Sequence, residues 1–112
     1  MRLRSDLFVS ALTRRVFRSG GYAAVEIKGA ESAGAIYIRQ RFRDGLETLY
    51  APAPQMMFDE GEADGRLFER RFERVEAAEI DAFILRERRL DSDLWLVELE
   101  VDEIGDLFTV TD

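Results

Sequence analysis

Carboxylates and arginines are the residues of this chain that could do chemistry. The sequence contains no cysteine and no histidine, which excludes disulfides, thiolate nucleophiles, imidazole bases and most zinc or haem ligation. What remains is acid–base work by paired carboxylates, or recognition of anions by guanidinium groups. We predict no catalytic residue, no cofactor and no metal site.

The acidic loop in the middle of the chain resembles a calcium-binding loop. Glu60, Glu62, Asp64 and Gly65 occupy relative positions 1, 3, 5 and 6 of a twelve-residue loop. Position 12 is Arg71, where calcium requires a bidentate carboxylate. The pattern therefore favours a solvated acidic turn over an ion site.

A second carboxylate pattern lies near the C-terminus. Glu98 and Glu100 alternate along a predicted strand, so their Cα atoms would be about 7 Å apart on one face. Such a pair could serve acid–base or metal-assisted hydrolysis, but the sequence places no nucleophile or oxyanion donor beside it. We interpret these acids as facing water or pairing across the sheet with Arg39 and Arg41.

The charges of the chain are unevenly distributed. Residues 1–45 carry nine basic and four acidic residues, whereas residues 46–112 carry seven basic and nineteen acidic ones. Either the two halves neutralise each other in the fold, or the first half presents a basic patch to an anionic partner. The candidate anion-binding residues are Arg39 and Arg41, followed by Arg14, Arg15 and Arg18. Nucleic acid is disfavoured as the anion, because the net charge is −7.

The first half of the chain predicts one helix followed by strands. Ser5 to Arg18 has an apolar stripe at helical spacing, Ser5 is a suitable N-cap, and Gly20 and Gly21 end the helix. Three β-rich runs follow, and Asp44-Gly45 between the second and third is a strong hairpin signal. The predicted strands are 22–28, 35–42 and 46–51, which we expect to form an antiparallel meander.

The second half predicts a strand, a helix and a final strand. Residues 67–75 fit both a strand and a helix, and we predict a strand. Residues 76–90 have an amphipathic helical pattern. In residues 94–101, Trp95, Val97 and Leu99 share one face of a strand.

These elements predict a single α+β domain over residues 1–112. We expect a mostly antiparallel sheet of four to five strands with both helices packed on one face, because this arrangement buries the apolar stripes. The N-terminal pattern does not match an export signal, and no apolar run approaches the length of a membrane span. We therefore expect a cytoplasmic protein with no membrane partner.

Several blocks of the sequence together resemble a known family. The blocks are Ser5-Asp6, Val9 to Leu12, Arg14 to Val16, Gly20 to Ala23, Arg70 to Val75, and Asp91 to Glu100 with Asp93-Leu94-Trp95 at its centre. They are similar to a short alphaproteobacterial family catalogued as a domain of unknown function. The resemblance implies a cytosolic, stand-alone bacterial protein and brings no activity, cofactor or catalytic residue.

The function that these observations favour is binding rather than catalysis. We expect a non-enzymatic protein-interaction or structural module that uses an open sheet face or edge and could form a homodimer. This predicts an apolar or aromatic patch left exposed on the monomer. The alternative is binding of an anion or a nucleic acid by the arginine-rich N-terminal half.

Overall fold

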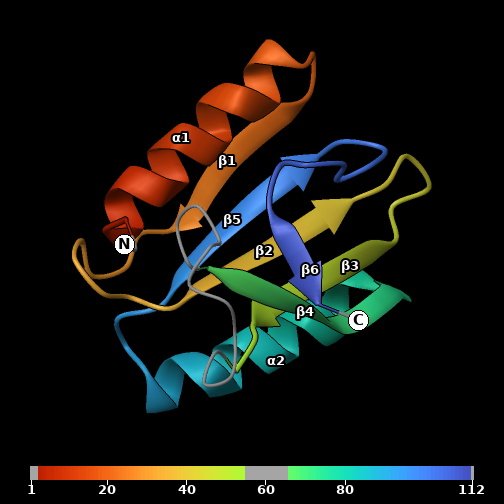
Figure 1. Ribbon diagram of the computed structural model, residues 1–112. Coiled ribbons are helices and arrows are strands. Elements are labelled where there is room, and N and C mark those ends of the chain that lie inside the picture. Colours follow the sequence, from red (N-terminus) through yellow and green to blue (C-terminus); the bar gives the residue numbers. More distant parts are fainter. Residues whose placement is uncertain (1–2, 55–65, 112) are drawn as a thin grey trace.

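Two helices enclose a six-stranded sheet in the computed structural model, which describes residues 3–54 and 66–111 (Figure 1). The calcium-like positions Glu60 to Gly65 lie outside the described residues. The helices are α1 (Ser5–Arg18) and α2 (Ala77–Leu90). The strands are β1 (Tyr22–Ile27), β2 (Ile36–Arg41), β3 (Glu47–Pro52), β4 (Leu67–Val75), β5 (Trp95–Glu100) and β6 (Thr109–Thr111).

The sheet is mixed, and its strand order is β1-β5-β2-β3-β4-β6. Strand β5 is parallel to β2 and β6 is parallel to β4, whereas the other neighbours are antiparallel. The α+β class is confirmed, but the expected four to five antiparallel strands are not. The expected meander is wrong at its first step, because β5 lies between β1 and β2.

Two glycines explain how β5 enters between β1 and β2. The loop from β1 to β2 crosses over the start of β5, where Ala30 N donates to Asp93 O at 3.0 Å and Trp95 Nε1 donates to Ala30 O at 2.8 Å. A Cβ atom on Gly29 would lie 2.1 Å from Asp93 O, and one on Gly34 would lie 2.2 Å from the same atom. Only glycine permits this close crossing of two backbones.

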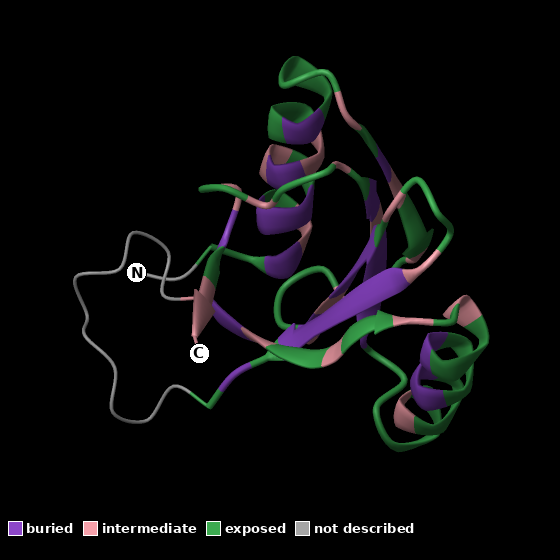
Figure 2. Ribbon diagram, turned by 90° about the vertical axis from the view of Figure 1, so that its right-hand side faces the viewer, coloured by how far each residue is buried: buried purple, intermediate pink, exposed green. Residues whose placement is uncertain are grey.

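The two helices cover opposite faces of the sheet, so the prediction that both pack on one face is wrong (Figure 1). On β5, Trp95 and Val97 belong to the core beneath α1, whereas Leu96 belongs to the core beneath α2. A sheet that is apolar on both faces must be covered on both. Figure 2 shows the buried residues concentrated on the strands and on the inward side of α1.

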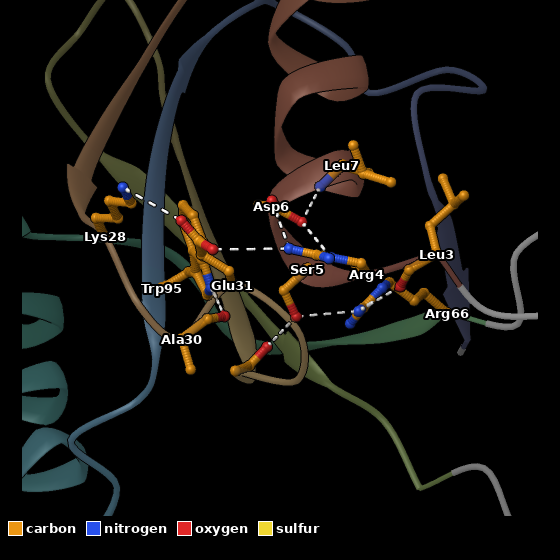
Figure 3. A network of polar contacts seen from close by, with 11 residues as sticks. Leu3, Arg4, Ser5, Asp6, Leu7, Lys28, Ala30, Glu31, Arg66 and Trp95 are labelled. Atoms are coloured by element: carbon orange, nitrogen blue, oxygen red, sulfur yellow. Dashed lines mark hydrogen bonds and ion pairs between the residues drawn. The ribbon is translucent and has the colours of Figure 1, made fainter.

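The start of α1 is fastened by a buried serine rather than by a cap. Arg4 is the N-cap and makes no side-chain cap bond, so the prediction for Ser5 is wrong. Ser5 Oγ donates to Gly34 O at 2.6 Å and accepts from Arg66 Nη2 at 3.1 Å (Figure 3). These contacts tie the helix to the loop before β2 and to the residue that precedes β4.

Local signals in the sequence located most of the elements. Helix α1 has the predicted bounds, residues 67–75 form the predicted strand β4, and the turn at Asp44-Gly45 joins β2 to β3 with Gly45 at φ 87°. Strand β6 was not predicted. Neither of the described helices is long and apolar enough to cross a bilayer.

Candidate interaction site

A buried ion-pair cluster occupies the α2 face of the sheet. Arg39 projects from β2, and its side chain is 6% exposed. Its guanidinium group lies 2.6 Å from Glu47 on β3, 2.8 Å from Asp81 on α2 and 3.3 Å from Glu26 on β1. Burial alone would lower the pKa of Arg39, but the hydrogen bonds to Glu47 and Asp81 outweigh it and raise that pKa.

Arg41 extends the same cluster toward the end of β2. It lies 2.7 Å from the second oxygen of Glu47, whose side chain is 0% exposed, and 4.0 Å from Glu98 on β5. Desolvation raises the pKa of Glu98, a hydrogen bond with Glu100 raises it further, and Arg41 only partly opposes these effects. The negative charges of Glu26 and Glu100 also contribute to raising the pKa of Glu98, so two further carboxylates lie near it.

The cluster contains more acids than bases. Two arginines, Arg39 and Arg41, face five carboxylates on the same side of the sheet, namely those of Glu26, Glu47, Asp81, Glu98 and Glu100. Because Arg39 already contacts three carboxylates, its positive charge is compensated within the fold. The cross-sheet pairing of Arg41 with Glu98 agrees with our interpretation of the sequence, whereas the roles of Glu26, Glu47 and Asp81 were not predicted.

The sequence did contain a signal for Glu47. The Asp44-Gly45 hairpin sets the register of β2 against β3, and in that register Arg41 lies opposite Glu47. Directly opposite residues point to the same face, so a charge pair could have been predicted there. No comparable local signal links Arg39 to Asp81, which is 42 residues away.

The other three candidate arginines lie on α1, away from this cluster. Arg14 donates to Ser10 Oγ at 2.9 Å within the helix. Arg15 donates to Leu107 O at 3.0 Å and to Asp106 O at 2.9 Å, so it fastens the segment before β6. The side chain of Arg18 makes no hydrogen bond or ion pair within the part of the chain that the structure describes. The structure thus does not bring the five candidate residues into one anion site, and anion binding by α1 stays a prediction.

Strand β1 forms an outer edge of the sheet, next to the ion-pair cluster. It pairs with β5 on one side, and no other strand of the described ranges lies on its second side. The pairing is regular from Tyr22 to Val25, and a bulge follows between Val25 and Ile27. The regular stretch has the sequence Tyr-Ala-Ala-Val, which contains no charged residue.

The bulge turns two consecutive side chains of β1 toward α2. Glu26 reaches Arg39, and Ile27 packs against the core beneath α2. Beside them lies a shallow groove between β1, β5 and α2, with a volume of about 250 Å³. Its apolar lining comes from Ile27, Ile84, Leu85 and Leu96, and its charged lining comes from Glu26, Arg39, Asp81 and Arg88.

Exposed apolar side chains accompany this edge. Tyr22 is 48% exposed and Val25 is 43% exposed. The ring of Phe17 at the end of α1, itself 53% exposed, makes an edge-to-face contact with Tyr22 at a centroid distance of 5.8 Å. We call Tyr22 to Val25, together with Phe17, the β1 edge patch.

The opposite edge of the sheet, formed by β4 and β6, is built differently. There β6 covers only Leu67 to Glu69 of β4. The remainder of β4, residues 70–75, carries Arg70, Arg71, Glu73 and Arg74. Charged side chains along an edge oppose pairing with another strand. The β1 edge patch lacks this protection over its regular residues.

Two larger clefts lie on either side of the segment after β5. One has a volume of about 720 Å³ and is lined by Gly21, Arg41 and Arg43 among others, and the second, of about 770 Å³, has a floor of Gln40, Thr48 and Tyr50. Tyr50 and Gln40 in that floor bond to each other at 3.0 Å. Among the described residues, no group of three or more acids is arranged to hold a metal ion.

Comparison with known proteins gives a family and a fold. The model of the family "Protein of unknown function (DUF1491)" matches residues 3–109. A solution structure of an A. tumefaciens protein is 60% identical, with a TM-score of 0.87 over 100% of this chain and 97% of that chain. A crystal structure of a DUF1491 family protein from Caulobacter crescentus CB15 is 28% identical, with a TM-score of 0.80 over 100% of both chains. A search of curated proteins found no match.

Proposed function

This chain belongs to the DUF1491 family, and we propose that it is a non-enzymatic protein-interaction module that accepts an extended segment of another polypeptide at β1. The observation that carries this proposal is the β1 edge patch, an uncharged and regular strand edge with exposed apolar side chains beside it. An added strand would form main-chain hydrogen bonds with β1, and its alternate side chains would provide specificity. A cytoplasmic location is part of the proposal.

The groove beside α2 supports strand addition at this position. A segment that pairs with Tyr22 to Val25 would continue past the bulge, where Ile27 and Leu85 offer apolar surface. Strand edges that lack charges, bulges or a covering element are the ones that recruit further strands. The bulge of β1 therefore limits regular pairing to Tyr22–Val25 and marks where such a segment would leave the sheet.

Selection of binding peptides tests the proposal directly. Random peptides displayed on phage are selected on the immobilised chain, and the selected peptides are titrated into the isotope-labelled protein. We expect the backbone amide signals of Tyr22 to Val25 to shift first. Val25→Lys should weaken binding, because a lysine protects an edge, whereas Leu90→Lys at the 84% exposed end of α2 should not. Peptides that shift only signals elsewhere would contradict the proposal.

Anion binding by the N-terminal half remains the alternative. Because Arg39 is buried among carboxylates, the alternative now depends on Arg14 and Arg18 of α1. It requires that the chain be retained on immobilised nucleic acid at low salt and that Arg14→Gln with Arg18→Gln abolish this retention. Absence of retention at low salt would remove it.

A further inference from the structure

We propose that the segment which docks on β1 is basic on the side that faces α2 and apolar on the side that faces α1. This inference rests on the proposed strand addition and specifies its partner as an extended polypeptide with alternating basic and apolar residues. It follows from the difference between the two faces of the sheet at this edge.

On the α2 side, the strands nearest the edge carry an excess of negative charge. Glu26 lies on β1, and Glu98 and Glu100 lie on β5, whereas the nearest cations of the cluster are Arg39 and Arg41 on β2. Directly opposite residues of neighbouring strands lie about 5 Å apart, so a residue added outside β1 at the bulge would meet Glu26 before either arginine of β2. A lysine or an arginine there would compensate the excess.

Ala24 leaves the path from the edge to Glu98 open. The two residues are Cα partners in the pairing of β1 with β5, so they point to the same face. An added residue opposite Ala24 would lie two strand spacings from Glu98, roughly 10 Å. Because Ala24 has only a methyl group, a long basic side chain can extend over it and meet the Glu98 carboxylate.

On the α1 side, the edge favours apolar contact. Val25 lies opposite Val97, which belongs to the core beneath α1, and yet Val25 is 43% exposed. An apolar residue on the added strand would cover it. The spacing of alternating side chains thus places basic residues toward Glu26 and Glu98 and apolar residues toward Val25.

Arg88 limits where basic side chains of the partner can lie along the groove. Arg88 follows Asp81 by seven residues on α2, which places it about 10 Å further along the helix. The basic side chains of the partner therefore belong at the Asp81 end of the groove, beside Glu26. The Arg88 end suits an acidic residue or an uncharged one.

The same charges disfavour a second copy of this chain as the occupant. Pairing of β1 with β1 of another copy would bring two sets of Glu26, Glu98 and Glu100 to one junction. Like charges that face each other across strands are destabilising, and each chain already carries a net charge of −7. A basic partner relieves this repulsion instead of doubling it.

Three blocked hexapeptides of alternating residues test the inference by NMR titration of the full chain. In the first, arginine alternates with valine; in the second, glutamine replaces arginine; in the third, glutamate does. We expect the arginine peptide to shift the amide signals of Tyr22 to Val25 at a concentration at least about tenfold lower than the glutamine peptide, with no effect of the glutamate peptide. This preference should weaken as salt is added, because the acids are partly exposed.

Two variants of equal charge change make the test specific. Glu98→Gln removes the carboxylate that lies opposite Ala24, and we expect it to weaken binding of the arginine peptide about tenfold or more. Glu73→Gln changes the net charge equally on the exposed part of β4, and it should leave binding unchanged. Equal loss in both variants would show a non-specific charge effect and overturn the inference.

The outcomes separate this inference from the proposed function. If the glutamine and arginine peptides bind β1 equally well, strand addition stands and the basic preference falls. If no peptide affects Tyr22 to Val25, both fall. Light scattering provides the remaining outcome, because a dimer that protects the amide hydrogens of Tyr22 to Val25 from exchange would make a second copy the occupant and overturn the basic partner.

Discussion

Replacement of Glu47 by glutamine should remove a large part of the stability of this fold. The Glu47 carboxylate is completely buried and lies 2.6 Å from Arg39 and 2.7 Å from Arg41. Breaking a buried ion pair by removing one partner costs about 3–5 kcal/mol. Arg39 retains Asp81 at 2.8 Å and Glu26 at 3.3 Å, so we expect the lower end, about 3 kcal/mol.

Equilibrium unfolding in urea measures this loss. With an m-value of about 1.5 kcal/mol/M for a chain of this size, the midpoint for Glu47→Gln should fall by about 2 M. The exposed control Glu73→Gln should stay within about 0.5 kcal/mol of the parent chain. A change below about 1 kcal/mol for Glu47→Gln would refute the view that Arg39 depends on this carboxylate.

A double substitution shows whether the stability lost in Glu47→Gln comes from leaving Arg39 buried without its partner or from losing a pair that is itself stabilising. In Arg39→Met with Glu47→Leu, both charges leave the core, while Arg41, Asp81 and Glu26 all reach water. Buried pairs replaced by apolar residues of similar volume are often close to neutral. We therefore expect the double variant to be more stable than Glu47→Gln, and a loss equal to or greater than that of the single variant would contradict this reasoning.

Three further outcomes follow from single contacts. Ser5→Ala should lower the free energy of unfolding by about 1–2 kcal/mol, because the buried Gly34 carbonyl loses its donor, and urea unfolding measures this. Gly29→Ala should destabilise the chain by at least about 1–3 kcal/mol, because its Cβ would lie 2.1 Å from Asp93 O; an unchanged midpoint in urea would contradict the crossing. Burial and the neighbouring Glu87 raise the pKa of Tyr37 to about 12. An ultraviolet titration of tyrosine ionisation should therefore show a component near pH 12 in the parent chain that is absent from Tyr37→Phe. The unfolded chain ionises this tyrosine first, so its contribution to stability is full below pH 10 and is lost as the pH rises to about 12.

The elements could be predicted from the sequence where their causes are local. The stripe of α1 and the Asp44-Gly45 turn each depend on residues within a few positions, and both are confirmed. The strand order depends on contacts between residues far apart, such as Ala30 with Asp93. A signal for a sheet covered on both faces was Leu96, an apolar residue between Trp95 and Val97, which our interpretation of that strand left out.

The candidate site was only partly predictable for the same reason. The sequence singled out Arg39 and Arg41 as partners of acids across the sheet, but whether a guanidinium group is available depends on its neighbours from other elements. Glu47 comes from the next strand, and Asp81 comes from α2, which follows β4 in the chain. Only the fold brings both carboxylates to Arg39. Composition indicated a basic N-terminal half, whereas the geometry surrounds its central arginine with acids.

The charge at the β1 edge is therefore a consequence of how the cluster is divided among the strands. Both arginines lie on β2, and the fully buried Glu47 on β3 contacts both of them from the side away from the edge. Glu26, Glu98 and Glu100 lie on β1 and β5, the two strands nearest this edge. Glu26 lies 3.3 Å from Arg39, and Glu98 lies 4.0 Å from Arg41. Because opposite charges compensate best at the shortest distance, compensation is strongest inside the sheet and weakest at its rim. The interior pairs thus hold the core together, and the less compensated acids lie beside the strand edge, where a polypeptide could supply a further cation.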